Sequence, residues 1–218
     1  MEEQLRAELV SKVKKLNTVK AALVLAVSVL GLVLAIVNLV SAKFLFTIGY
    51  LIAGSLGAAY SAIEINQTYV PLIEVSEETL NLRTWDNGFL PYNIDFKPKF
   101  FQDFIPSKMV IHEIPVSDIT EIAVGSKGFL IKSVMSIELN EIFSDISNRA
   151  PRTDNIMKRF DIMSVKLKDG TVYAMNVKNF DKNALYEIVD FIEHRVAEFD
   201  FKTNIRVLRK MRETTGNV

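Results

Sequence analysis

Residues that could carry out chemistry are few and widely spaced in this chain. It has no cysteines, which excludes thiol nucleophiles, disulfides and cysteine-ligated clusters. The two histidines, His112 and His194, lie far apart, so we expect no transition-metal site. Asp118 and Glu121 are close in sequence, but an acid–base mechanism needs a nucleophile paired with a base, and no histidine accompanies them. We therefore predict that the chain is not an enzyme and has no catalytic residues, no metal ligands and no cofactor.

Two further ligand classes find no support in the sequence. The stretch Gly125-Ser126-Lys127-Gly128 lacks the spacing and the Ser or Thr of a phosphate-binding loop, so we expect a turn there. The 26 Lys and Arg residues balance 26 Asp and Glu residues, so no global field favours nucleic acid. We expect neither a nucleic-acid partner nor a small-molecule substrate.

A segment in the middle of the chain combines aromatic rings with lysines. This combination is typical of an interfacial contact, because rings enter the headgroup boundary of a bilayer while ammonium groups meet lipid phosphate. The same rings are equally able to pack over the core of a domain, and the sequence leaves both interpretations open. The residues of this candidate membrane or partner contact are Phe96, Lys97, Lys99, Phe100, Phe101 and Phe104.

The C-terminal tail, residues 201–218, is basic. Five Lys and Arg residues stand against Glu213 alone and alternate with apolar residues. The pattern predicts a helix that continues past Phe201, facing an anionic leaflet, a protein partner or only solvent. The basic residues are Lys202, Arg206, Arg209, Lys210 and Arg212.

The elements that would position these residues begin with two charge-free apolar runs, Ala21–Ala42 and Phe44–Ile63, separated by Lys43. A hydrocarbon core of about 30 Å needs about 20 helical residues to cross it, and each run is long enough. The first run is too long for a cleaved signal peptide, and a second follows at once. Residues 19–64 therefore predict a transmembrane hairpin in a multi-pass protein of the plasma membrane.

Orientation follows from the Lys and Arg residues beside the spans. The N-terminal flank, residues 1–20, holds five of them, whereas the connection between the spans holds only Lys43. Positive charge stays on the cytoplasmic side, so we expect the N-terminus and the C-terminal domain to be cytoplasmic.

The second span carries two pairs of small residues at a spacing of four. Such pairs let helix backbones approach closely in lipid. The face serves either packing against the first span or association with a partner protein or a second copy. The residues are Gly54 with Ala58, and Gly57 with Ser61.

Residues 1–18 form an amphipathic N-terminal segment. Leu5, Leu9, Val13 and Leu16 are spaced as on one face of a helix, with charges between them. This helix would lie on the membrane surface, pack on the soluble domain or self-associate, and the sequence does not choose among these.

Residues 65–200 predict a soluble domain of alternating strands that closes with one helix. A Lys168-Asp169-Gly170 turn joins the last two strands. Asp181 or Asn183 would cap the helix, whose apolar stripe ends at Val196. We expect an α+β fold that is independent of the spans, so that residues 65–218 fold alone. The predicted strands are Tyr69–Val75, Thr79–Trp85, Val110–Val116, Ile119–Val124, Gly128–Leu139, Asp161–Leu167 and Thr171–Val177.

This order of elements resembles the bacterial pleckstrin-homology-like (PH-like) domain, a family often tethered to membrane helices. The resemblance covers roughly residues 66–199. It depends on the strand-turn-strand segment Ile114–Ile122 and on the hairpin Val165–Gly170 before the final strand and helix. It implies an antiparallel β-barrel or sheet capped by a C-terminal helix, with a binding or scaffolding role and no catalytic site.

Three functional hypotheses follow. The favoured one is a membrane-tethered adaptor whose PH-like domain binds a protein or peptide at the cytoplasmic face. The alternatives are a peripheral sensor of anionic lipid and an accessory subunit of a membrane transport or secretion complex. The lipid bilayer is a partner in all three.

Overall fold

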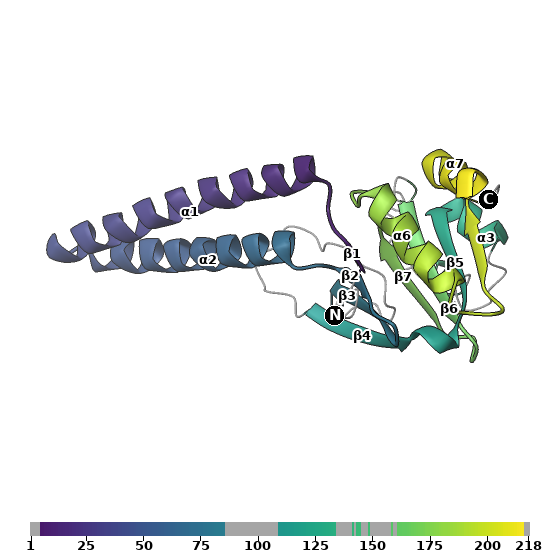
Figure 1. Cartoon of the computed structure of the whole chain (residues 1–218). Coiled ribbons are helices and arrows are strands. Elements are labelled where there is room, and N and C mark those ends of the chain that lie inside the picture. The colour runs from purple at the N-terminus through teal and green to yellow at the C-terminus, as the bar shows by residue number, and fades with distance from the viewer. Residues whose placement is uncertain are drawn as a thin grey trace. The chain divides into compact units, whose positions relative to one another are not determined.

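The computed structural model describes residues 5–85, 109–133 and 161–215. It also describes the single residues Glu141, Phe143, Ser144, Asn148 and Lys158. The chain divides into two compact units (Figure 1). Residues 9–70 form a helical hairpin, and residues 5–8, 71–85 and the described residues from 109 onward form a domain of sheets and helices. The fold is α+β, as the sequence predicts.

The hairpin consists of α1 (Ser11–Val40) and α2 (Phe44–Tyr69). A three-residue turn joins them, in which Ala42 adopts a positive φ of 56° and the Lys43 amide donates to Asn38 O at 2.8 Å. Each helix is long and apolar enough to cross a membrane. Helices satisfy their own backbone hydrogen bonds, which hydrocarbon requires of any spanning segment.

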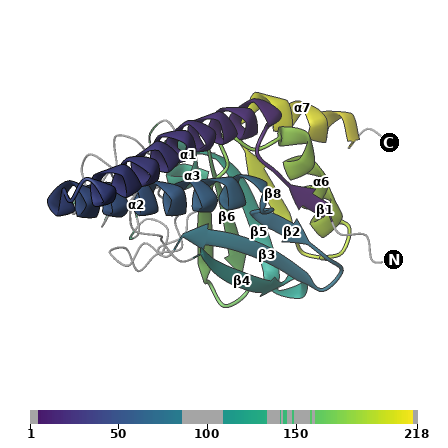
Figure 2. The same cartoon turned by 90° about the vertical axis from the view of Figure 1, so that its left-hand side faces the viewer.

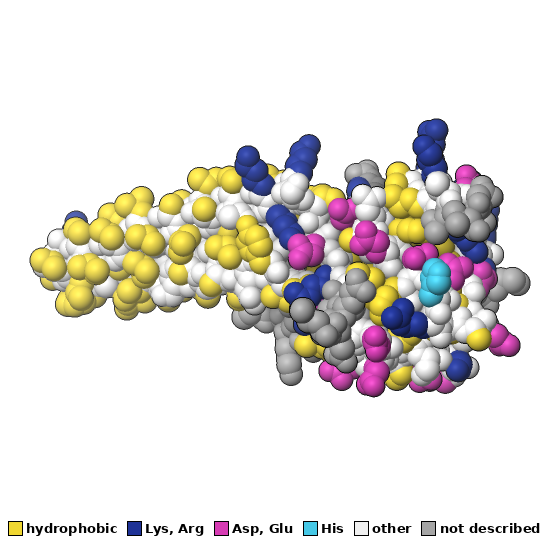
Figure 3. All heavy atoms as spheres, viewed as in Figure 1, with side chains coloured by type: hydrophobic (Ala, Val, Ile, Leu, Met, Phe, Trp, Pro, Cys, Tyr) yellow, Lys and Arg dark blue, Asp and Glu magenta, His cyan; other side chains and the backbone are white. Residues whose placement is uncertain are grey.

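Apolar side chains cover the surface of the hairpin (Figure 3). Leu23, Val27, Ile36 and Leu45 are among the many large apolar residues exposed along α1 and α2. A water-soluble protein rarely exposes so large a continuous apolar surface. The exposed apolar surface therefore favours lipid as the surroundings of both helices.

The first sheet is antiparallel and has the strand order β1-β2-β3-β4. Its strands are β1 (Leu5–Ala7), β2 (Ile73–Val75), β3 (Thr79–Trp85) and β4 (Met109–Pro115). In this sheet β1 precedes the hairpin in the chain, whereas β2, its hydrogen-bonded neighbour, follows the hairpin. Their register places Ala7 opposite Ile73 and Leu5 opposite Val75.

The second sheet has the order β7-β6-β5-β8. A short 3-10 helix, η1 (Val116–Asp118), leads from β4 into β5 (Ile119–Ser126). Strands β6 (Asp161–Leu167) and β7 (Val172–Asn176) form the predicted hairpin. Gly170 has a φ of +91° in its turn, a conformation that glycine adopts without strain. Strand β8 (Asp200–Thr203) runs parallel to β5.

Within residues 109–133 and 161–215, the domain contains the helices α3 (Lys127–Ser133), α6 (Lys182–Glu193) and α7 (Arg206–Thr215). The predicted cap of α6 is confirmed, since the Asp181 carboxylate accepts from the Asn183 amide at 2.9 Å. Helix α6 contacts both β1 and β8 (Figure 2) and α3 contacts β5 and β6. The buried face of α6 consists of Leu185, Ile188, Val189 and Ile192.

The structure contradicts several of the predicted elements. A strand predicted at Gly128–Leu139 is instead α3 where it is described, with Lys127 and Leu130 buried one turn apart. The strand expected from Tyr69 begins at Ile73, because α2 continues to Tyr69 and Pro71 disfavours helix in the residue before it. The tail is not one continued helix, since β8 pairs with β5 before α7 begins.

The N-terminal segment is also not one amphipathic helix. Leu5 lies in β1, because pairing with β2 satisfies the backbone there, and α1 begins only at Ser11. Of the predicted antiparallel barrel or sheet, the described residues show sheets and no closed barrel. In the described part of the chain the strands form two separate four-stranded sheets, which β1 and β8 extend at their edges.

Candidate functional site

The predicted aromatic contact lies outside the described residues. Its six residues fall within residues 86–108, which the structure does not describe: Phe96, Lys97, Lys99, Phe100, Phe101 and Phe104. A role for them at the membrane or in a partner contact stays a prediction.

The small residues of α2 lie against α1. A Cβ placed on Gly54 would come within 2.8 Å of Leu32 Cγ and 2.9 Å of Ser28 O, and a Cβ on Gly57 would overlap Ser28 Oγ. Ser61 is fully buried, and Ala58 beside it is partly buried. These approaches are closer than a side chain permits, so glycine allows the two helices to pack within one molecule.

A seven-residue repeat explains this packing, and pairs of small residues four apart do not reveal it. Every seventh residue is small and buried on each helix, which places these residues on one seam of a left-handed pair. The repeat is visible in the sequence once the period is known. Its members are Ala21, Ser28 and Ala35 on α1, and Thr47, Gly54, Ser61 and Thr68 on α2.

Cysteines at the seam would distinguish packing within one molecule from dimerisation. A Cβ on Gly57 would lie 3.3 Å from Ser28 Cβ, near the distance that a disulfide needs. We expect the double variant Ser28→Cys/Gly57→Cys to oxidise within one chain and remain a monomer on non-reducing gels. The chain has no other cysteine, and Ser28→Cys alone is the matched control because it leaves Gly57 unchanged. A disulfide-linked dimer from that single variant would instead assign the face to association between copies.

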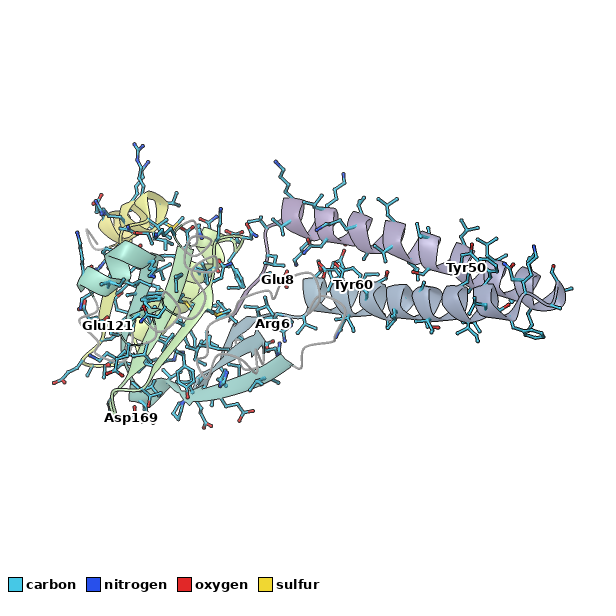
Figure 4. All side chains as sticks on the ribbon, turned by 180° about the vertical axis from the view of Figure 1, so that it is seen from behind. Arg6, Glu8, Tyr50, Tyr60, Glu121 and Asp169 are labelled. Carbon is cyan, nitrogen blue, oxygen red and sulfur yellow. The ribbon has the colours of Figure 1, made fainter. Side chains whose placement is uncertain are left out.

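The end of the hairpin away from the turn carries polar contacts. The Tyr69 hydroxyl lies 3.0 Å from Thr18 Oγ1, and Lys14 Nζ lies 5.9 Å from the centre of the Tyr69 ring. Two further tyrosines, Tyr50 and Tyr60, occupy α2 (Figure 4). A lysine over a tyrosine ring is typical of the membrane–water boundary, because both side chains have an apolar part and a polar end.

The ionisable residues singled out in the sequence have structural roles in the sheet domain. Lys202 Nζ on β8 lies 2.6 Å from Glu121 Oε2 on β5 and 3.1 Å from Asp200 Oδ2. Burial acts to lower the pKa of Lys202, but the hydrogen bonds to Glu121 and Asp200 outweigh it, so this pKa is raised. The ion pair joins β8 to β5. Glu121 Oε1 is buried without a hydrogen-bond partner (Glu121 is labelled in Figure 4).

The two histidines have separate surroundings. The His112 ring lies 5.1 Å from the Tyr173 ring, and burial lowers the pKa of His112. His194 ends α6, where its Nδ1 lies 2.8 Å from Asp190 O. Among the described residues, no group of three or more His, Asp or Glu side chains is arranged to hold a metal ion.

The stretch from Gly125 to Gly128 is the junction of β5 and α3. A Cβ on Gly125 would overlap both Asn204 and Phe129, so glycine permits close approach of β8 and α3 to β5. Lys127 at the start of α3 is buried, with its Nζ 5.2 Å from the centre of the Phe143 ring. These contacts give the segment a packing role.

The basic tail presents most of its charge to solvent on α7. Leu208 is buried and anchors the helix, whereas Val207 is exposed. Arg212 stacks near the Phe201 ring and donates to Phe201 O. Three other basic residues of α7 are exposed: Arg206, Arg209 and Lys210.

No protein-family model matches the chain, and neither a curated protein nor a solved structure matches it. The PH-like identity therefore stays a prediction from the sequence.

Proposed function

We propose that this protein is a membrane-tethered adaptor whose PH-like domain binds a protein or peptide at the cytoplasmic face of the plasma membrane. The observation that carries the proposal is the pairing of β1 with β2. These strands belong to one sheet but lie on opposite sides of the hairpin in the chain. Both ends of the hairpin lead into this one sheet, which supports a topology in which they emerge on the same side of the membrane.

The charges beside the helices support the cytoplasmic side. Lys12, Lys14, Lys15 and Lys20 lie in the first part of α1, and Lys43 alone lies in the turn. The side with more Lys and Arg is retained in the cytoplasm during insertion.

The connectivity of the sheet domain supports the PH-like assignment. Two sheets follow one another along the chain, and the amphipathic helix α6 contacts an edge strand of each, β1 and β8. At the other edges, His112 of β4 stacks near Tyr173 of β7. β4 ends the first sheet in the described residues, and an edge strand with unpaired backbone groups is one to which an extended peptide adds as a further strand.

The topology is tested with single cysteines in the otherwise cysteine-free chain. We expect Lys178→Cys, on an exposed turn of the domain, to react with a membrane-impermeant maleimide only after cells are opened. Ser41→Cys, in the turn of the hairpin, should react in intact cells. Labelling of both positions from the same side would contradict the hairpin.

A second candidate function is a peripheral sensor of anionic lipid, which the exposed basic residues and Val207 of α7 favour. Co-purification of the full-length protein from native membranes in mild detergent separates the two candidates. A stoichiometric protein supports the adaptor, whereas anionic phospholipid lost on the replacement Arg206→Gln/Arg209→Gln/Lys210→Gln supports the sensor.

A further inference from the structure

One face of the first three turns of α1 combines lysines with exposed apolar residues. Residues that follow Lys12 by three, four, seven and eight positions lie on the same side of the helix as Lys12. They are Lys15, Leu16, Val19 and Lys20. Leu16 is 59% exposed and Val19 is 48% exposed, and all three lysines are exposed. We call these five residues the basic face of α1.

Neither water nor hydrocarbon alone suits this composition. Exposed Leu16 and Val19 favour an apolar environment, whereas three ammonium groups are costly inside the hydrocarbon core. A bilayer interface suits both, since apolar side chains enter the acyl boundary while lysines extend to the headgroups.

The dimensions of the helix place this face at that boundary. Helix α1 has 30 residues, about 45 Å at 1.5 Å per residue, whereas the hydrocarbon core is about 30 Å thick. The charge-free part begins at Ala21, so the three turns before it extend beyond the hydrocarbon. Tyr69 of α2, which contacts Lys14 and Thr18, lies at the same level and is 55% exposed.

The exposed ionisable side chains of α1 and α2 have one sign. Helix α1 contains no Asp or Glu, and the one carboxylate of α2, Glu64, is 3% exposed. Lys14 is directed to the Tyr69 ring and is not part of the basic face. An anionic partner therefore meets three ammonium groups without a competing exposed carboxylate on α1 or α2.

We infer that the basic face of α1 binds the headgroups of anionic phospholipids, with the ammonium groups on the phosphates and Leu16 and Val19 against the upper acyl chains. This inference depends on the membrane insertion contained in the proposed function, and it goes beyond it by assigning a lipid class and a site. None of its five residues belongs to residues 96–104 or to α7.

The test uses the full-length protein in mixed micelles of phosphatidylcholine and phosphatidylglycerol, with bound lipids counted by native mass spectrometry. We expect the wild-type chain to be enriched in phosphatidylglycerol. The variant Lys12→Gln/Lys15→Gln/Lys20→Gln should lower that enrichment roughly tenfold or more, because each lysine contributes to attraction at an anionic surface. The variant Lys12→Arg/Lys15→Arg/Lys20→Arg should keep the enrichment in phosphatidylglycerol, because it keeps the positive charges.

The matched control is Lys132→Gln/Lys168→Gln/Lys178→Gln, which removes three exposed lysines from the sheet domain. Equal enrichment in the α1 variant and this control would overturn the inference. Carbonate extraction of native membranes shows whether only the lipid site is wrong or the membrane tether is wrong as well. A chain that stays in the membrane without lipid preference contradicts only the lipid site, whereas a chain released by carbonate contradicts the membrane tether as well.

Discussion

Replacing Ile188 with aspartate is expected to unfold the sheet domain at ordinary temperatures. Ile188 is 1% exposed on the face of α6 that closes the domain core. The change removes a large apolar side chain and forces an unpaired carboxylate into the core, at a combined cost of roughly 4 kcal/mol or more. Natural domains are stable by only about 5–15 kcal/mol, so little or no cooperative unfolding should remain.

The matched control for this change is Glu187→Asp. It introduces the same residue at the neighbouring position, which is exposed. Near-ultraviolet circular dichroism of the full-length proteins in detergent during heating reports the packing of the domain. Melting temperatures within a few degrees of each other for the two variants would show that α6 does not cover the core.

Removing β1 is expected to have the second large effect. Ala7 is fully buried, Glu8 O accepts from the Asp181 amide at 3.1 Å, and Arg6 Nε lies 2.9 Å from Glu74 Oε1. Each backbone hydrogen bond lost contributes about 1 kcal/mol, and the apolar surface left uncovered adds to it. A fragment that begins at residue 65 should therefore be less stable by roughly 3 kcal/mol than one that retains β1, contrary to the independence expected from sequence.

The comparison uses a soluble chain in which residues 5–10 are joined to Pro71 by a short Gly/Ser linker that replaces the hairpin. The control carries the same linker with Leu5, Arg6 and Ala7 replaced by Gly-Ser-Gly. Urea unfolding should place the midpoint of the first protein well above that of the control. Equal midpoints would mean that β1 is not part of the folded domain.

The sequence predicted those elements whose signal is local. Strands β3 and β6 have the predicted bounds, because alternation and turn residues mark them without reference to the rest of the chain. The hairpin followed from the length of two apolar runs, and α6 followed from its stripe and its cap.

The elements that depend on distant partners were missed. Strands β1 and β8 have three and four residues, too few for a periodic pattern, and each exists through pairing with a strand remote in sequence. The sequence predicts a strand in place of α3 because a short apolar run fits either structure, and packing on β5 decides between them. In the hairpin, the sequence shows the pairs of small residues on α2. The seven-residue seam follows only once the two helices are known to pack against each other, because that packing sets the period.

The position of β1 ahead of the hairpin has a consequence for biogenesis. During synthesis this strand leaves the ribosome first, yet β2 becomes available only after both helices have been made. Closing a free loop between Ala7 and Ile73 would cost roughly 4 kcal/mol in chain entropy. Contacts such as that of Thr18 with Tyr69 bring the two ends of the hairpin together, so packing of α1 against α2 removes most of that cost in advance. If the helices insert as proposed, maturation of the sheet domain is tied to delivery of the chain to its membrane.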